Sequence, residues 1–591
     1  MSRVKFTYFA IMAASILFFT VLQRDQLEFH PIIDDYLVIN FEKVTKGSLW
    51  DFHNRFDFSL LTDYDRVTDA TSWRLWWGDP SLKIKFFRPL SDFSFSVDEQ
   101  LPGKGAYFFR LHSMVWAILY IGIIGVIFYR LLRPLHGAFS TLIIGISLPL
   151  SLHILWIASR CHLMASVFSL AAFCFYLKWH ETSFNPRYKV AMLLLLILSL
   201  ASSEAGYFGF LLIFFYEWIF FGGGIRNLFT KSFFILVILV IYTQLYLLGG
   251  YGAKNSGFYT SFLENPLAFF KVFPARYPIL IAAQIGLDLG KSCDGAYPAK
   301  FYAAAFILIS AFSCGLYFTI KDQNEKMRKL IKWLVVVNLT TLVPFVSIPP
   351  HPRVFLMSQF SIVPLSIMQI ATLGELTREK SFPVRALSLA WRAYLSLIFF
   401  VLYPLTTFIS TDLAEKHIIA FENVMKESEF TDLNGYDNEY FVINAGLAIF
   451  NDSYTESGYK YFHPGSRPFH WNIMTISEND MSLKLLDDRT LEITYIAGDV
   501  MDFRKSTIFR QKERQFKQGT MIHQGSMDVT ILELSENGFP KKMRFHFLRP
   551  LDYPGYHFVT WKGNRFVKFE MPKAGKETVV EKPALPSDLV L

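Results

Sequence analysis

Long apolar runs alternate with short polar segments over the first two thirds of the chain, whereas the last third is polar. A run of roughly 18 or more apolar residues can cross a membrane as a helix, since each residue advances about 1.5 Å through an apolar layer about 30 Å thick. The sequence therefore predicts a polytopic α-helical membrane protein with about 11 transmembrane helices. The predicted spans are 6–23, 106–129, 137–157, 161–178, 188–202, 205–221, 232–248, 300–320, 332–349, 353–373 and 389–409.

Lysine and arginine residues are distributed unequally between the two sides of these spans. With the N-terminus in the cytoplasm, the short external turns carry only Arg160 and Arg353. Basic residues concentrate on the cytoplasmic side of membrane proteins, so this bias supports both the span count and the orientation. The residues expected on the cytoplasmic side are Arg3, Lys5, Arg130, Arg133, Lys178, Arg187, Lys189, Arg226, Lys231, Lys321, Lys326, Arg328, Lys329, Lys332, Arg378, Lys380 and Arg385.

The first span is expected to remain as an anchor, because Leu22-Gln23-Arg24 lacks the small residues of a signal-peptide cleavage site. Three longer segments are then expected outside: 24–105, 249–299 and 410–591. The first of these is rich in aromatic residues such as Trp76 and Trp77, and we expect it to pack onto the membrane face.

The polar tail predicts a second, β-rich domain outside the cytoplasm, so the chain divides into residues 1–409 and 410–591. Residues 490–496 and 529–534 alternate between apolar and polar side chains in the manner of strands. Two hairpins are expected, with turns at Asn537-Gly538 and at Gly563-Asn564.

The composition of the 591 residues agrees with this architecture. Hydrophobic residues make up 52% and charged residues only 18%, whereas soluble domains carry about 25% charge. A soluble cytosolic enzyme, a disordered scaffold and a disulfide-stapled secreted domain are excluded. The net charge of +8 follows the cytoplasmic turns, so it indicates topology and no nucleic-acid partner.

An acidic pair, Asp34-Asp35, follows the first span within about ten residues, in the stretch Pro31-Ile32-Ile33-Asp34-Asp35-Tyr36. Neighbouring carboxylates in a partly desolvated setting shift each other's pKa values apart, which leaves one of them suited to accept a proton. The alternative is a solvated pair of loop acids without a chemical role.

Several short motifs, in order along residues 1–400, resemble those of the GT-C superfamily of membrane glycosyltransferases, and most of all protein O-mannosyltransferases. Besides the acidic pair, they are Phe87-Arg88-Pro89-Leu90, Trp156-Ile157-Ala158-Ser159-Arg160, Ala201-Ser202-Ser203-Glu204 and Arg353-Val354-Phe355-Leu356-Met357-Ser358. The sequence departs from the family pattern at Ser203, where lysine is common, and at His162, where an acid is common. These departures leave the sugar and the acceptor open.

The resemblance implies a GT-C-like module that transfers a sugar from a polyprenyl-phosphate carrier to a hydroxyl of a protein, lipid or glycan on the external face. In such an inverting reaction a base removes the proton of the acceptor hydroxyl, and the resemblance gives this role to Asp34, with Asp35 as its partner. Arginine matches phosphate geometry, so Arg88, Arg160 and Arg353 are candidates for the donor phosphate. Their alternative role is to extend from the membrane interface into water.

Three further residues are candidates to line the site. Glu204 ends a span, and a carboxylate at that depth is expected at the rim or in an ion pair. His162 could orient phosphate, ligate a metal or bond within the bundle. Arg276 lies in an apolar, proline-punctuated stretch, 269–289, where it could contact the carrier. The sequence indicates no cofactor and leaves a divalent metal open.

Two other functions stay open at this point. A transporter or flippase for a lipid-linked sugar often shows internal repeats, and none is visible here. The second open function is a non-catalytic scaffold whose tail binds an envelope partner. The expected location is a bacterial inner membrane, with the site and the tail in the periplasm. The endoplasmic reticulum is the alternative.

Overall fold

Contacts along the chain divide the computed structural model into two units, one built of helices and one rich in strands. The helical unit comprises Met1–His30, Phe86–Tyr251 and Asn265–Asp412, and the strand unit comprises Pro31–Lys85, Gly252–Glu264 and Leu413–Leu591. The predicted boundary was at residue 409, but the contacts assign two earlier segments, Pro31–Lys85 and Gly252–Glu264, to the same unit as the polar tail. The structure describes residues 3–39, 55–58, 75–101, 105–222, 224–289, 297–321, 323–378, 380–429, 438–446, 452–464, 469–500, 506–511 and 513–584.

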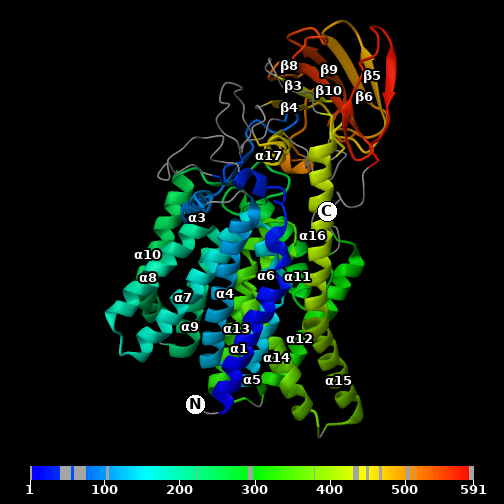
Figure 1. The fold of residues 1–591 in the computed structure, drawn as a ribbon. Coiled ribbons are helices and arrows are strands. Elements are labelled where there is room, and N and C mark those ends of the chain that lie inside the picture. Colours follow the sequence, from blue (N-terminus) through cyan, green and yellow to red (C-terminus); the bar gives the residue numbers. More distant parts are fainter. Residues whose placement is uncertain are drawn as a thin grey trace. The chain divides into compact units, whose positions relative to one another are not determined.

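Every predicted span coincides with a helix or with consecutive helices of the helical unit (Figure 1). The helices are α1 (Arg3–Leu22), α3 (Pro89–Glu99), α4 (Ala106–Leu131), α5 (Pro134–Gly145), α6 (Leu148–Leu155), α7 (Arg160–Glu181), α8 (Pro186–Ser202), α9 (Tyr207–Tyr216), α10 (Gly224–Leu248), α11 (Pro266–Ala283), α12 (Ala299–Lys321), α13 (Glu325–Leu342), α14 (Gln359–Leu376), α15 (Phe382–Ser396) and α16 (Tyr403–Glu427). Two π-helical turns, Glu217–Phe221 and Leu397–Leu402, follow α9 and α15. The boundary between the two units falls within α16, after Asp412.

Among the described residues, nine helical segments are long and apolar enough to cross a membrane, so the protein is a polytopic membrane protein. They include α11, which adds a segment to those expected, and they leave out α8, α10 and α14. Helix α8 has only 17 residues, and α14 carries buried Gln359 and Gln369. The Gln369 side chain accepts a hydrogen bond from Trp391 Nε1 at 2.9 Å, which satisfies its polar group inside the bundle.

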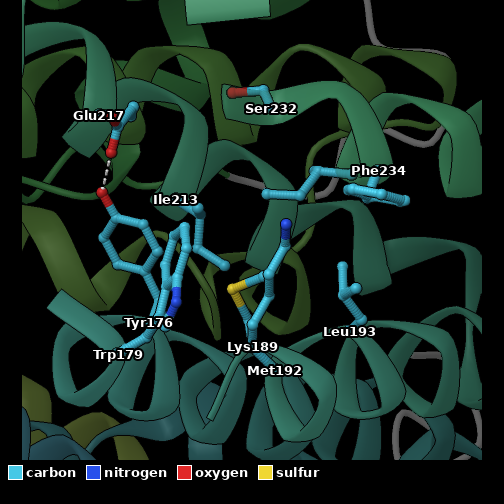
Figure 2. Close-up of a pocket in the computed structure, with 10 residues that line it drawn as sticks. Tyr176, Trp179, Lys189, Met192, Leu193, Ile213, Glu217, Ser232 and Phe234 are labelled. Carbon is cyan, nitrogen blue, oxygen red and sulfur yellow. Dashed lines mark hydrogen bonds between the residues drawn. The ribbon is translucent and has the colours of Figure 1, made fainter. Parts of the chain in front are cut away.

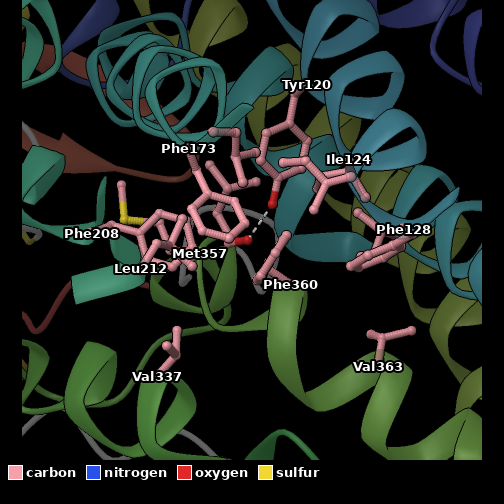
Figure 3. Close-up of a cluster of buried hydrophobic side chains, with 14 of the residues drawn as sticks. Tyr120, Ile124, Phe128, Phe173, Phe208, Leu212, Val337, Met357, Phe360 and Val363 are labelled. Carbon is pink, nitrogen blue, oxygen red and sulfur yellow. Dashed lines mark hydrogen bonds between the residues drawn. The ribbon is translucent and has the colours of Figure 1, made fainter. Parts of the chain in front are cut away.

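Aromatic side chains lie among the aliphatic residues in the core of the helical unit, and one of them holds the turn that precedes α14. Figure 3 shows Phe173, Phe208 and Phe360 within this cluster. Phe173 stacks on Trp333 with 5.2 Å between ring centroids. The buried Tyr120 hydroxyl donates to the carbonyl oxygen of Leu356 at 2.5 Å, which ties α4 to the residues just after Arg353.

Two local breaks shape the end of the helical unit that carries the candidate residues. The predicted span 137–157 is divided into α5 and α6, because Pro149 in the first turn of α6 cannot continue a preceding helix. Between α8 and α9 the chain turns sharply at Glu204–Gly206. A Cβ atom on Gly206 would lie 2.5 Å from the carbonyl carbon of Ser199, so only glycine allows this turn.

The strand unit contains two larger sheets and a two-stranded sheet of β1 (Lys83–Lys85) and β2 (Gly252–Lys254). The four-stranded sheet has the order β11-β10-β3-β4, and the six-stranded sheet has the order β12-β5-β6-β9-β8-β7. The remaining strands are β3 (Glu439–Val442), β4 (His470–Ile473), β5 (Met481–Leu485), β6 (Thr490–Tyr495), β7 (Met521–Gln524), β8 (Met527–Leu534), β9 (Pro540–Phe547), β10 (Tyr556–Lys562), β11 (Arg565–Lys568) and β12 (Glu577–Val580). Both predicted hairpins are confirmed as the antiparallel pairs β8–β9 and β10–β11.

Strands β3 and β4 are parallel, and α17 (Asp452–Phe462) connects them (Figure 1). Parallel neighbours require such a crossover, which is usually a helix. The sequence analysis did not predict the arrangement β3–α17–β4, because buried parallel strands lack a clear alternation of apolar and polar residues. The start of α17 therefore follows the carboxyl end of β3.

Two tryptophans of the first external segment, Trp76 and Trp77, pack within this unit. Trp76 Nε1 donates to the carbonyl oxygen of Met474 at 2.9 Å, and the Trp76 ring meets the edge of Phe545. Trp77 is fully buried. Both tryptophans therefore pack within the strand unit, where the chain after β4 provides the acceptor that the buried indole N–H of Trp76 needs. The packing of this segment onto the membrane face stays a prediction.

Candidate functional site

The acidic pair lies in the strand unit, where a strained turn and two hydrogen bonds hold it. Ile33 has φ = 43°, which is unfavourable for a β-branched residue. Asp35 is fully buried, and its Oδ2 accepts from the backbone N–H of Ile32 at 3.2 Å. Asp34 is only partly buried. Such strain clusters at functional sites, where the surrounding structure maintains it.

Tyr454, in the first turn of α17, donates its hydroxyl hydrogen to Asp34 Oδ1 at 2.7 Å. Burial, and then the charge of Asp34, raise the pKa of Tyr454 well above its usual value. The phenol therefore keeps its proton at physiological pH and serves as a donor. Next to the pair, Tyr36 stacks on Phe421 with ring centroids 5.1 Å apart. The crossover helix and the aromatic packing together orient the acidic pair.

Arg110, which the sequence reasoning missed, anchors the chain just before the acidic pair. Its guanidinium is fully buried in the helical unit and donates to the carbonyl oxygens of Phe29, His30 and Leu155. The bond to His30 measures 2.7 Å. A lone arginine within an otherwise apolar span was the available signal, because such residues are costly and usually functional.

Arg88, directly before α3, forms an ion pair with Glu204 from the tight turn between α8 and α9. Arg88 Nε donates to Glu204 Oε2 at 3.0 Å, and the second nitrogen pairs with Oε1. A third contact runs from Arg88 to the Cys161 sulfur at 3.4 Å. The guanidinium also lies over the Phe86 ring, 4.4 Å from its centroid. Glu204 was expected either at the rim of the site or in an ion pair, and the structure shows the ion pair. This pair orients Arg88.

His162 lies beside this ion pair. Its Nδ1 is 2.9 Å from Ser203 Oγ, so the two positions that depart from the family pattern contact each other. The rings of His162 and His153 are 6.2 Å apart. Cys161, next to His162, contacts Arg88. His153 belongs to α6, on which the element that contains Arg353 packs, so these two predicted arginines lie in one region of the helical unit.

Arg353 lies in the short helical turn Pro352–Phe355 and over the Trp156 ring, 4.4 Å from its centroid. The element that contains Arg353 (Pro352–Phe355) packs on α6, which ends just before Trp156. Within the part of the chain that the structure describes, the Arg353 guanidinium has no hydrogen bond or ion pair. Its donors are therefore available to an anion.

Arg160 is held quite differently from Arg88 and Arg353. It is fully buried and forms an ion pair with Asp98 Oδ2 at 2.5 Å. Its remaining donors reach Ser113, Ser94 and the carbonyl oxygen of Phe109 at 2.6–3.0 Å. The structure thus places Arg160 in a network that joins α3, α4 and α7, although the sequence suggested a phosphate ligand.

Arg276 also lies apart from the Arg88 region. It is 5% exposed, and its guanidinium donates to the carbonyl oxygen of Val346 at 2.9 Å. This bond joins α11 to the turn after α13. Among the described residues, no group of three or more His, Cys, Asp or Glu side chains is arranged to hold a metal ion.

The comparisons with known proteins give distant structural likenesses. No family model matches the chain, and no curated protein matches it in sequence. The chain is similar to ArnT from Cupriavidus metallidurans in the apo state, with 13% identity, a TM-score of 0.41 and coverage of 79% of this chain and 86% of that chain. For the same protein bound to undecaprenyl phosphate, the values are 11%, 0.38, 92% and 98%.

A third solved structure is the oligosaccharyltransferase of Archaeoglobus fulgidus, tethered to an acceptor peptide. It is 10% identical, with a TM-score of 0.41 and coverage of 79% of this chain and 64% of that chain. These likenesses assign no role to any residue of this chain. Its own helices and strands define an integral membrane protein with a strand-rich C-terminal part.

Proposed function

We propose that the protein is a GT-C-type membrane glycosyltransferase that moves a hexose from a polyprenyl-phosphate carrier to an acceptor hydroxyl on the external face. The acceptor is a protein, a lipid or a glycan, and residues 1–409 form the catalytic module. The observation that carries the proposal is the preorganised acidic pair. The pair has a strained turn, a hydrogen bond from Tyr454 and a buried Asp35. A solvated pair of loop acids without a chemical role needs none of these three features.

Asp34 is proposed as the general base and Asp35 as its partner. Asp34 is the more exposed of the two, which supports this division of roles, since a base must reach the acceptor hydroxyl. Asp34 takes the hydroxyl proton, and the acceptor oxygen forms a bond to the anomeric carbon. The bond from that carbon to the phosphate oxygen breaks, and the carrier phosphate leaves with the electron pair. Attack opposite the leaving group inverts the anomeric configuration.

Arg88 and Arg353 are proposed to hold the carrier phosphate. Arg353 has available donors, and Trp156 stacking fixes the plane of its guanidinium, which favours bidentate contact with phosphate. Glu204 holds Arg88 in place, and His162 and Ser203 line the same region. The networks around Arg160 and Arg276 support structural roles for those two residues, so neither is included among the proposed phosphate ligands.

Replacement of the base tests the proposal. We expect Asp34→Asn to reduce transfer from labelled undecaprenyl-phosphate hexoses about 10²–10⁴-fold, the usual contribution of a general base. Asp35→Asn should give a smaller loss. Transfer is measured in membranes after confirming that each variant is folded and monodisperse in detergent.

Asp57→Asn is the matched control for this experiment. Asp57 belongs to the same external segment and pairs with Lys85 at 2.9 Å, so its loss should leave transfer within twofold of wild type, as expected for a weak surface pair. Full transfer by both Asp34→Asn and Asp35→Asn would remove the proposed base.

A further inference from the structure

Helices α14 and α15 pack on each other as a hairpin, and two arginines lie on one face of its second helix. Arg385 and Arg392 of α15 are seven residues apart, which is nearly two full helical turns, so both lie on the same side of the helix. Arg385 is exposed and Arg392 is half-buried. By the charge bias, the connection between the two helices lies on the cytoplasmic side.

Arg392 rests on the last part of α14. Its Nε donates to the carbonyl oxygen of Ile370 at 2.8 Å. The guanidinium lies on the backbone of Gly374, where an added Cβ would be 2.6 Å from Cζ. Gly374 is two residues before the last residue of α14, which is about 3 Å along the helix axis. The charge of Arg392 therefore lies at the end of the bundle, the level at which arginine side chains usually reach the membrane interface.

The terminal nitrogens of Arg392 are available to a ligand. Among the described residues, neither Nη1 nor Nη2 forms a hydrogen bond or an ion pair, and neither atom is buried. These two nitrogens carry four of the five N–H donors of a guanidinium. Arg385 likewise has no hydrogen bond or ion pair with its side chain in the part of the protein that the structure describes. The face thus presents two cations without partners.

Two other basic residues expected on the cytoplasmic side are already engaged within the protein. Arg130 pairs with Glu181 at 3.5 Å. Figure 2 shows Lys189 beside Phe234, and the ammonium nitrogen lies 4.4 Å from the centroid of that ring. The two arginines of α15 have no comparable acid or ring, which distinguishes their face from these other basic positions.

The hairpin also has a net positive charge. Its segment 374–392 contains four basic residues, Arg378, Lys380, Arg385 and Arg392, and two acidic residues, Glu375 and Glu379. Glu379 lies outside the described residues. An excess of two positive charges favours a ligand with a net negative charge over a zwitterionic one.

We propose that Arg385 and Arg392 bind the phosphate of an anionic phospholipid of the adjacent leaflet, namely phosphatidylglycerol. Arg392 donates to the phosphate oxygens through its terminal nitrogens, and Arg385 adds a second charge on the same face. The head group stays on the surface of the protein, and the acyl chains follow exposed apolar side chains of α15 such as Leu389. Phosphatidylcholine carries the same phosphate, but the basic residues repel its quaternary ammonium. The proposal is independent of the proposed transferase function.

Lipid selectivity tests this site in the full-length protein. Purified protein is titrated with phosphatidylglycerol or phosphatidylcholine of identical acyl chains, and lipid adducts are resolved by native mass spectrometry. We expect the first phosphatidylglycerol to bind at least about 10-fold more tightly than the first phosphatidylcholine. Arg392→Gln should weaken phosphatidylglycerol binding about 10-fold, the usual effect of losing a hydrogen bond between charged groups.

Two further variants complete the experiment. Arg385→Gln should weaken phosphatidylglycerol binding about 5-fold, as expected for one basic residue near the membrane surface. Arg130→Gln removes an arginine that is paired with Glu181, and it should keep the affinity of wild type. Equal binding of the two lipids by wild type would overturn the proposal. Wild-type affinity of Arg385→Gln would overturn it as well, even if Arg392→Gln failed to fold, because Arg385 is exposed and its loss breaks no contact between side chains of the described residues.

Discussion

At the scale of single residues, hydrogen bonds between distant positions distinguish functional candidates from structural ones. Asp34 and Tyr454 are 420 positions apart in the sequence and share one bond of 2.7 Å. Arg160 and Asp98 are both almost fully buried and satisfy each other. Arg353 instead stacks on Trp156 and keeps its donors available. Two arginines that look alike in sequence therefore differ in what their guanidinium groups contact.

Removal of the Tyr454 hydroxyl tests its role as a positioning residue for Asp34. A donated hydrogen bond favours the charged form of a carboxylate, so Tyr454→Phe should move the acidic limb of the pH–rate profile to higher pH. We expect kcat to fall about 10-fold, since a bond to a charged group contributes about 1.5–3 kcal/mol, with KM for the donor nearly unchanged.

Tyr459→Phe removes a hydroxyl from the same helix without affecting the bond to Asp34, and it serves as the control for Tyr454→Phe. A uniform loss of activity with an unshifted pH profile would indicate that Tyr454 contributes only to stability.

At the scale of elements, charged side chains join neighbouring helices of the helical unit. The Arg160–Asp98 ion pair connects α7 to α3, and the further bonds of Arg160 reach α4. Arg110 connects α4 to the end of α6 and to the chain before the acidic pair. In the strand unit, α17 between β3 and β4 presents Tyr454. Each of these helices thus holds a polar side chain that bonds to a neighbouring element.

The buried ion pair should make a large contribution to the stability of the helical unit. Asp98→Asn leaves the buried Arg160 charge without its carboxylate, which typically costs about 3–5 kcal/mol. We expect a clear fall in the thermal unfolding midpoint in detergent, measured by fluorescence-detected size-exclusion chromatography.

A surface pair provides the comparison for Asp98→Asn. Arg130→Gln removes the exposed contact with Glu181 at 3.5 Å, and a pair of this kind contributes only about 0–1 kcal/mol. Equal midpoints for the two variants would contradict the structural role given to Arg160.

At the scale of the whole molecule, the chain passes between its two units after His30, Lys85, Tyr251, Glu264 and Asp412. The strand unit is therefore assembled from an early segment, a short middle segment and the tail. Each of the three segments expected outside, 24–105, 249–299 and 410–591, contributes residues to this unit, and the orientation stays a prediction from the basic residues.

Reporter fusions test this orientation. Alkaline phosphatase, which is active only outside the cytoplasm, should be active when fused after Leu591 and inactive when inserted between α14 and α15. Green fluorescent protein at the second position should fluoresce. The opposite pattern would place the acidic pair in the cytoplasm and remove the basis for a polyprenyl-phosphate donor.

The sequence by itself determined the helical spans, the polar tail and both hairpins, because the length of an apolar run, strand alternation and an Asn-Gly or Gly-Asn turn are local properties. It also identified Asp34, Arg88, Glu204 and Arg353 as candidates. Only the tertiary structure decided that Glu204 pairs with Arg88, that Arg160 pairs with Asp98 and that Tyr454 reaches Asp34. Local patterns do not contain these pairings, because the packing of segments distant in sequence brings the partners together.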